Sequence, residues 1–376
     1  MDTASKLAPM DVAGRLARLR PLLDEGEGDA RADTLLVTSM TNIRYLTGFT
    51  GSAGTLVVGP DKATLVTDGR YGEQAEAQIK AAEADVVVEV AGASNQKEIL
   101  ASAVPEKAKH LGLESAHVSW ARQRLLAEDW FSGKELVPTV GLVERLRRVK
   151  DRGELDRLAR AAQIADQALA NTRKLLEEAP AEVEFGLALD TEMRRLGAEG
   201  PSFDTIVAAG ANGAMPHHRP DHTGIEPGKA VVLDFGALVD GYCSDMTRTV
   251  WVGELSDAQM RRAVMVVAAS QAAGVETVVK GAETKDVDKA CRDVIEEAGW
   301  GEHFLHSTGH GVGLDIHEAP SVAATSTDTL AAGYVVTVEP GVYLPGLGGV
   351  RIEDTVVVDD DGGRTPLTLT PKDLVA

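Results

Sequence analysis

The sequence predicts an α+β protein of two domains, a smaller α/β domain over residues 1–150 and a larger domain over residues 151–376. Three observations indicate this. The chain has 376 residues, which is too long for one ordinary hydrophobic core and suits two. Helix and strand patterns alternate up to about residue 139, as in a compact α/β domain. In the second half, four carboxylates lie inside β-branched, apolar runs, where burial is costly unless each is paired or binds a metal.

The spacing of apolar residues predicts the N-terminal elements. Apolar positions recur at helical spacing over residues 10–24, which predicts an amphipathic helix. Runs rich in β-branched residues predict strands, and residues 39–42 are expected to form a polar turn between two of them. The expected strands are residues 35–38, 55–58, 63–67 and 86–90, and a further helix is expected at residues 70–82.

A change in composition near Lys150 marks the expected domain boundary. Residues 144–154 are densely charged, and we interpret them as a solvated linker that leads into a helix. Apolar residues then recur at helical spacing from residue 155 to residue 169. Further helices are expected at residues 183–197, 258–279 and 285–298.

Two of the four buried-looking carboxylates flank a predicted hairpin. Its two-residue turn is either 239–240 or 240–241, because a Val-Asp-Gly sequence joins the two strands. Side chains alternate between the faces of a strand with a period of two. Either turn therefore places Asp234 and Asp245 on the same face of the hairpin.

A second predicted hairpin joins residues 334–339 to residues 351–358 and carries Glu339 and Glu353. Taken singly, each acidic residue could be a solvated edge position. Four together, with a histidine in a glycine-rich segment, indicate that a cation holds them. Four carboxylates carry four negative charges, which two divalent cations would neutralise. Oxygen donors with one imidazole suit Mn, Co, Fe or Zn.

The histidines gather in the second half of the chain. His306, His310 and His317 are separated by glycines, which predict an irregular loop or a strand because three glycines weaken a helix. The spacing of His217 leaves its role open. His218 and His222 are expected to be exposed.

Composition excludes several classes of protein. The net charge of −20 disfavours nucleic acid as a partner. No apolar run approaches the roughly 18 residues that cross a bilayer. The N-terminus lacks the basic-then-apolar order of a signal peptide. Two cysteines, Cys243 and Cys291, fit a reducing compartment. We expect a soluble, cytoplasmic protein with neither a membrane nor a nucleic acid as partner.

Several motifs resemble the pita-bread metallopeptidases, the fold of methionine aminopeptidase, prolidase and aminopeptidase P. The C-terminal motifs are LDFG at 233–236, GYCSDMTRT at 241–249, HSTGHGVGLDIHE at 306–318, VTVEPGVY at 336–343 and GGVRIEDT at 348–355. TNIRYLTGFTGS at 41–52 and TDGRY at 67–71 resemble the creatinase-type N-terminal domain of bacterial aminopeptidase P and Xaa-Pro dipeptidases. The resemblance implies a pita-bread catalytic domain after a smaller creatinase-like domain.

Position by position, the resemblance implies a role for each motif residue. The implied metal ligands are Asp234, Asp245, His310, Glu339 and Glu353, with Asp245 and Glu353 bridging two divalent ions. The implied catalytic and substrate-binding residues are Glu339 as proton carrier, His317 as hydrogen-bond donor to the oxyanion or the carbonyl, and His217 and His306 beside the substrate. Tyr343 is implied to line a proline pocket, and Arg351 to support the ligands and the substrate.

The resemblance implies an aminopeptidase that releases the N-terminal residue from peptides with proline in second position. Two divalent ions, with Mn expected and Co, Zn or Fe as alternatives, would activate a hydroxide. A prolidase restricted to Xaa-Pro dipeptides shares every motif, so this alternative stays open. A non-catalytic binding protein on the same fold is disfavoured, because no ligand position is substituted. The resemblance also implies a homodimer or homotetramer, with the N-terminal domain of one subunit near the active site of another.

Overall fold

The computed structural model describes residues 7–25, 31–372 and 374–375, and these form two compact units. One unit comprises residues 9–147, and the other comprises residues 7–8 with the described residues from 148 onward. The division falls after Arg147, close to Lys150. No helix within the described ranges is long and apolar enough to span a membrane.

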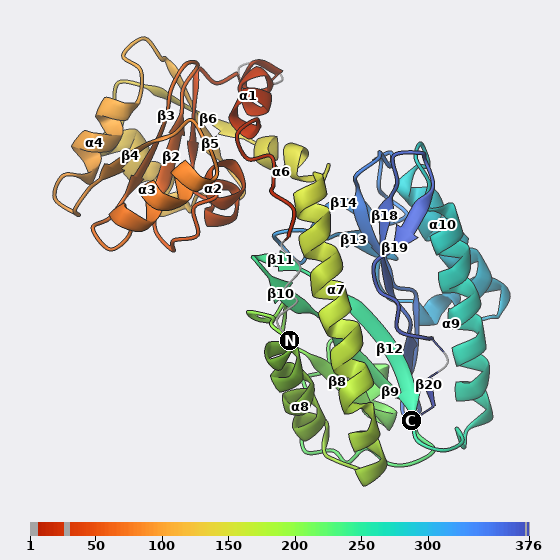
Figure 1. Ribbon diagram of the computed structural model, residues 1–376. Coiled ribbons are helices and arrows are strands. Elements are labelled where there is room, and N and C mark those ends of the chain that lie inside the picture. Colours follow the sequence, from red (N-terminus) through yellow and green to blue (C-terminus); the bar gives the residue numbers. More distant parts are fainter. Residues whose placement is uncertain (1–6, 26–30, 373, 376) are drawn as a thin grey trace. The chain divides into compact units, whose positions relative to one another are not determined.

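The N-terminal unit is built on one mixed six-stranded sheet (Figure 1). The strand order is β4-β3-β2-β1-β5-β6. The strands are β1 (Thr34–Val37), β2 (Thr55–Val58), β3 (Ala63–Thr67), β4 (Val87–Val90), β5 (His110–Glu114) and β6 (Glu135–Thr139). The helices are α1 (Arg15–Leu19), α2 (Met40–Thr47), α3 (Gly72–Ala81), α4 (Gln96–Ala103), α5 (Trp120–Leu125) and α6 (Leu142–Arg147). The sheet and α3 lie where the sequence predicts them.

Two N-terminal predictions were wrong. The polar segment 39–42 is not a turn but the start of α2, because the Ser39 hydroxyl accepts a hydrogen bond from the Asn42 amide and caps the helix. The helix expected over residues 10–24 is shorter, since α1 ends at Leu19 and the chain continues as a 3₁₀ helix over Arg20–Glu25. Capping by a polar side chain is invisible to a pattern of apolar residues.

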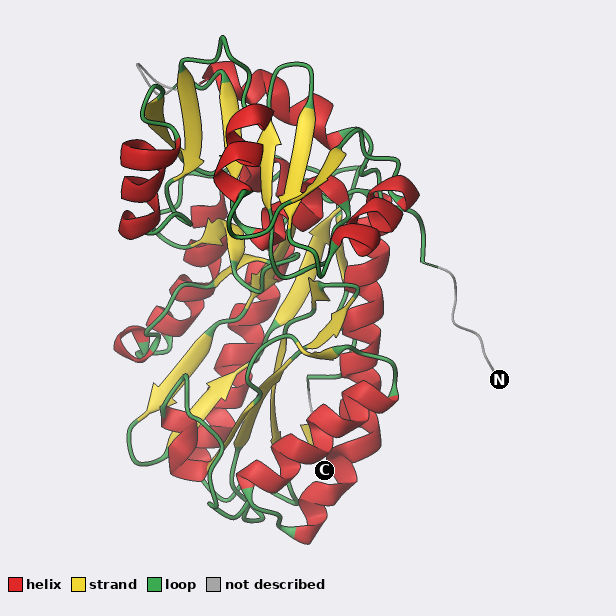
Figure 2. Ribbon diagram, turned by 90° about the vertical axis from the view of Figure 1, so that its left-hand side faces the viewer, coloured by secondary structure: helices red, strands yellow, loops and turns green. Residues whose placement is uncertain are grey.

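In the C-terminal unit, four long helices lie outside the strands (Figures 1 and 2). They are α7 (Arg152–Thr172), α8 (Glu182–Arg195), α9 (Ala258–Thr277) and α10 (Thr284–Glu297), each close to its predicted range. The strands of the first half are β7 (Gly200–Pro201), β8 (Ile206–Ala209), β9 (Val231–Phe235), β10 (Ala237–Val239), β11 (Tyr242–Cys243) and β12 (Met246–Trp251). Those of the second half are β13 (Gly309–Gly311), β14 (Glu318–Val322), β15 (Val335–Val338), β16 (Gly341–Leu344), β17 (Gly348–Arg351), β18 (Asp354–Val358), β19 (Arg364–Pro366) and β20 (Leu374–Val375).

The first acidic hairpin has the second of the two predicted turns. Val239 pairs with Tyr242, so the turn is 240–241, and both turn residues have positive φ angles, 44° and 74°. That conformation favours the Asp-Gly pair found there. The same register continues into β9 and β12, where Asp234 lies directly opposite Thr247. Asp245 is therefore a diagonal neighbour of Asp234 on the same face, as the period of two predicts.

The second acidic hairpin is interrupted at Glu339 and Glu353, so it consists of two strand pairs. β15 pairs with β18 and β16 pairs with β17, in one continuous register. This register brings Glu339 opposite Glu353 at the interruption. Glu339 and Glu353 are therefore not paired with each other as strand residues, and the strand pairs on either side fix the position of their backbones.

The charged stretch at the domain boundary is not a solvated linker. Lys150 and Glu154 are 4% and 2% exposed. The Lys150 ammonium donates to Oε1 of Glu318 at 2.6 Å, and Oε1 of Glu154 accepts from the Tyr242 hydroxyl at 2.9 Å. Both partners lie in segments that carry predicted site residues. The interpretation failed because the partner of Lys150 is 168 residues away in the sequence.

Replacing Lys150 by methionine should destabilise the C-terminal unit by about 3–5 kcal/mol, because the Glu318 carboxylate would stay buried without its cation. Urea unfolding followed by tryptophan fluorescence measures the change. The double variant Lys150→Met/Glu318→Gln removes both charges and should recover most of the loss. The exposed pair Lys289–Asp293 supplies the control, and Lys289→Met should leave the midpoint nearly unchanged. Equal midpoints for Lys150→Met and the wild type would contradict the expectation.

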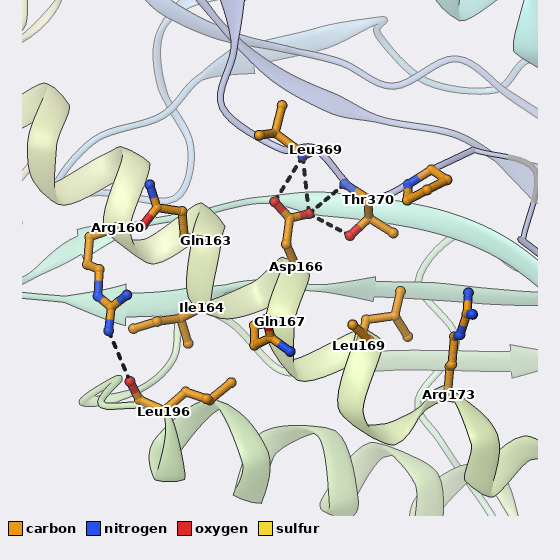
Figure 3. A pocket seen from close by; sticks show the side chains of 12 residues that line it. Arg160, Gln163, Ile164, Asp166, Gln167, Leu169, Arg173, Leu196, Leu369 and Thr370 are labelled. Carbon is orange, nitrogen blue, oxygen red and sulfur yellow. Dashed lines mark hydrogen bonds between the residues drawn. The ribbon is translucent and has the colours of Figure 1, made fainter. Parts of the chain in front are cut away.

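The C-terminal segment is fastened to α7 beside a cavity of about 550 Å³ (Figure 3). The carboxylate of Asp166 accepts hydrogen bonds from the backbone amides of Leu369 and Thr370 and from the Thr370 hydroxyl. The Thr370 carbonyl accepts two hydrogen bonds from Arg248. The Arg248 guanidinium also donates to the carbonyl of Glu353. None of the predicted site residues lines this cavity.

Candidate metal centre

The structure brings the predicted metal ligands together at the two hairpins. Asp245, His310 and Glu353 each offer one ligand atom, and these atoms lie within 4.8 Å of one another. The Nε2 atom of His310 lies 3.6 Å from Oδ2 of Asp245 and 3.3 Å from Oε1 of Glu339. Asp234, in β9, lines the same cavity as these four residues.

The cluster is electrostatically unfavourable without a cation. Burial raises the pKa of Asp245 and Glu353 well above the ordinary carboxyl value, and neighbouring carboxylates raise it further. Burial also raises the pKa of Asp234, although the charge of Arg351 opposes the rise. Buried charges of one sign cost free energy unless an opposite charge compensates them.

Glu339 and His310 behave as a pair within this cluster. Burial alone would raise the pKa of Glu339, but its hydrogen bond to His310 and the positive charges around it outweigh burial, and its pKa lies below the usual value. Burial alone would lower the pKa of His310, yet the hydrogen bond to Glu339 and its charge raise it. In the absence of a metal, Glu339 and His310 therefore each stabilise the charged form of the other.

Two carboxylate oxygens of the cluster have no hydrogen-bond partner among the described residues, Oδ1 of Asp234 and Oε1 of Glu353, and both are buried. The other oxygen of Asp234 accepts from Arg351 at 2.7 Å, and that of Glu353 accepts from the Thr247 hydroxyl at 2.8 Å. Buried polar atoms almost always have a partner. The free oxygens and the carboxylate–imidazole donor set fit a divalent metal centre.

Arg351 links the metal ligands to a second group of residues. It is 3% exposed, and it donates to Asp234 and, at 2.8 Å, to the Tyr343 hydroxyl. The same hydroxyl lies 2.8 Å from Nε2 of His306. Tyr343 is itself 2% exposed and lies behind the cavity wall, not in it. The Tyr343 hydroxyl thus joins His306 to Arg351, and the role in a proline pocket that the motif resemblance implies stays a prediction.

The three remaining histidines surround one cavity. His217, His306 and His317 line a cavity of about 980 Å³ together with the metal ligands and Arg351. The ring of His317 packs edge-on against that of His310, with 4.3 Å between their centroids. Burial and the charge of His310 lower the pKa of His317, which keeps its ring neutral near pH 7. A neutral imidazole retains one N–H donor.

Sequence reasoning missed one residue that contacts a predicted ligand and one residue in the cavity wall. Thr247 donates its hydroxyl to Glu353 and accepts from Nε of Arg351 at 3.1 Å. Its place on the face of Asp234 could have been found from the hairpin register. His218 was expected to be exposed, which is wrong, because its side chain is 9% exposed and its Nε2 lies 2.7 Å from Glu182. No pattern in the sequence connects His218 with Glu182.

An α+β unit with a carboxylate-rich metal centre in the wall of a large cavity defines a metal-dependent hydrolase. Residues 156–360 match metallopeptidase family M24, and residues 15–149 match the creatinase/prolidase N-terminal domain. The chain therefore belongs to metallopeptidase family M24. This confirms the predicted fold, a pita-bread catalytic domain after a creatinase-like domain.

Individual relatives span nearly the whole chain. The uncharacterized peptidase YqhT of Bacillus subtilis is 42% identical over 96% of this chain and 99% of its own. The Xaa-Pro dipeptidase of Bacillus anthracis has a solved structure with a TM-score of 0.89, 40% identity, and coverage of 96% of this chain and 98% of that chain. The X-Pro aminopeptidase of Thermotoga maritima gives a TM-score of 0.82 at 33% identity, covering 92% of this chain and 97% of that chain.

Proposed function

We propose that this metallopeptidase is an Xaa-Pro aminopeptidase, which releases the N-terminal residue from peptides with proline in second position. One observation carries the proposal, the convergence of His217, His306 and His317 on the cavity that holds the metal ligands. The cavity volume of about 980 Å³ lies at the upper end of the roughly 300–1,000 Å³ typical of small-ligand sites. A site of this size leaves room for a chain longer than a dipeptide.

The proposed metal centre holds two divalent ions on Asp234, Asp245, His310, Glu339 and Glu353, with Mn expected. When bound, the ions polarise the scissile carbonyl and lower the pKa of a water molecule. Asp245 and Glu353 would contribute the two buried carboxylates of this ligand set. Burial and neighbouring carboxylates raise the pKa of both groups, so positive charge beside them would stabilise their ionised forms.

The remaining steps belong to side chains of this chain. Glu339 accepts the proton of the attacking water and passes it to the leaving imide nitrogen. His317 donates a hydrogen bond to the carbonyl oxygen as negative charge develops there. His217 and His306 contact the substrate from other parts of the wall. The proline nitrogen has no hydrogen and its φ is fixed, so a wall shaped for the ring provides specificity.

Hydrolysis of two matched peptides tests the proposal. The Mn-loaded protein should release Xaa from both Xaa-Pro and Xaa-Pro-Xaa, and should leave Xaa-Ala-Xaa largely intact. Cleavage of the dipeptide alone would establish the alternative, an Xaa-Pro dipeptidase, which is the name of one close structural relative. No cleavage of any peptide with added Mn would favour a binding protein on this fold.

We also propose that the chain forms a homodimer or homotetramer. Sedimentation equilibrium measures this directly, and a fully active monomer would contradict it.

A further inference from the structure

A buried carboxylate outside the metal centre organises one wall of the cavity. Glu182 is the first residue of α8 and is fully buried. Its Oε1 accepts hydrogen bonds from the Ala209 amide at 2.7 Å and from the Asn212 side chain at 3.0 Å. Its Oε2 lies 2.7 Å from Nε2 of His218 and accepts from the Asp221 amide at 3.2 Å. One carboxylate thus joins α8, the end of β8 and the loop 215–223.

This arrangement is not a second metal site, although Glu182, His218 and Asp221 lie close enough to hold an ion. Each oxygen of Glu182 already contacts two nitrogen atoms, which satisfies a carboxylate. An ionised carboxylate only accepts hydrogen bonds, so Nε2 of His218 carries a proton toward it. A cation would have to displace this contact.

His217 lies between two residues, Pro216 and His218, that are each anchored by a hydrogen bond. No hydrogen bond or ion pair fixes its side chain in the part of the chain that the structure describes, and the residue is exposed in the cavity. The carbonyl of the preceding residue, Pro216, accepts a hydrogen bond from Nη1 of Arg351 at 3.3 Å. On its other side, the His218 ring is anchored on Glu182. The two anchors bracket His217 between the metal centre and α8.

We propose that Glu182 and His218 are positioning residues, which aim His217 at the substrate by fixing the backbone on its C-terminal side. This inference rests on the proposed function, in which His217 contacts the substrate. The His218 amide donates to the Met215 carbonyl at 3.1 Å, so the chain turns here. Successive side chains leave a turn in different directions, so His218 can point into the protein while His217 points into the cavity. Binding geometry errors of about 1 Å can cost on the order of 10²-fold in rate.

Replacing His218 by leucine tests the proposal, because leucine keeps the bulk and removes the donor to Glu182. We expect kcat/KM on an Xaa-Pro-Xaa peptide to fall by roughly 10- to 100-fold while metal content stays unchanged. His218→Gln should restore most of the activity, since its amide nitrogen reaches Glu182 at a similar distance. His222→Leu is the matched control, an exposed histidine of the same loop, and should behave as wild type.

A double variant separates positioning from a general structural role. If His218 acts through His217, then His218→Leu should cost little more in a His217→Ala background. A merely structural role would lower kcat/KM equally in both backgrounds, and this outcome would overturn the proposal. So would a His218→Leu variant with wild-type kcat/KM.

Backbone hydrogen exchange provides a readout that does not depend on activity. The Asp221 amide donates to Glu182, so His218→Leu should accelerate exchange there and at the neighbouring amides of residues 217–219, whereas His222→Leu should not. If the wild type cleaves no Xaa-Pro peptide, the proposed function fails and this measurement still decides the positioning role. Unchanged exchange in His218→Leu would reject it.

Discussion

Replacing Asp245 by alanine should abolish divalent-metal binding and peptidase activity together. One carboxylate oxygen of Asp245 lies within 4.8 Å of a ligand atom of His310 and of one of Glu353. Asp245 is 4% exposed. If Asp245 holds both ions, as the motif resemblance implies, its removal should weaken both sites. Metal analysis after loading with Mn and desalting should give about two ions per wild-type chain and close to none in the variant. Glu353→Ala should behave in the same way.

The loss should not come from unfolding. Burial and the charge of Glu353 raise the pKa of Asp245, so its ionised form opposes folding above the ordinary carboxyl pKa when no metal is bound. Metal-free Asp245→Ala should therefore melt no lower than the metal-free wild type at neutral pH. Asp360→Ala removes an exposed carboxylate after β18 and serves as a control that keeps its metal. Two ions retained in Asp245→Ala, or activity that survives a chelator, would refute the bridging role.

Replacing His317 by alanine should lower kcat on an Xaa-Pro-Xaa peptide by on the order of 10²–10³ while metal content stays at the wild-type value. His317 is exposed in the cavity and packs against His310, but it is not one of the clustered ligands. Removing it leaves every carboxylate in place. The rate falls because the developing negative charge on the carbonyl oxygen loses one hydrogen-bond donor.

If His317 is only structural, the expected results for His317→Ala are different. The melting temperature would drop and turnover per folded molecule would stay nearly constant. Metal content, melting temperature and kcat measured on one preparation distinguish the two roles. His222→Ala, which removes an exposed histidine elsewhere in the chain, should change none of the three values.

The sequence predicted local geometry well and distant partnerships poorly. The alternation of side chains placed Asp234 and Asp245 on one face, and the Asp-Gly pair at 240–241 adopts the positive φ angles that set the register. These features depend on neighbours along the chain. The apolar surroundings of the four carboxylates indicated a metal site, but the position-by-position ligand roles came from motif resemblance, because nothing local predicts that His310 meets Glu339.

Charged residues were the main source of error. Lys150 looked like part of a solvated linker and is buried against Glu318. His218 looked exposed and is buried against Glu182. In both pairs, each partner alone resembles an ordinary surface residue, and only the fold reveals that the two compensate each other. A single sequence contains both side chains of each pair but not the distance between them.

The fastening of the C-terminal segment has a consequence for protein synthesis. Arg248 contacts the carbonyl of the metal ligand Glu353 and the carbonyl of Thr370, and Asp166 holds the same segment on α7. A growing chain on the ribosome cannot present a complete ligand set before Glu353 has emerged. The contacts of Arg248 and Asp166 with this segment cannot form until the residues near Thr370 have also been synthesised. A chain synthesised only as far as Glu353 would thus hold all five proposed ligands without the contacts that fix this segment on α7.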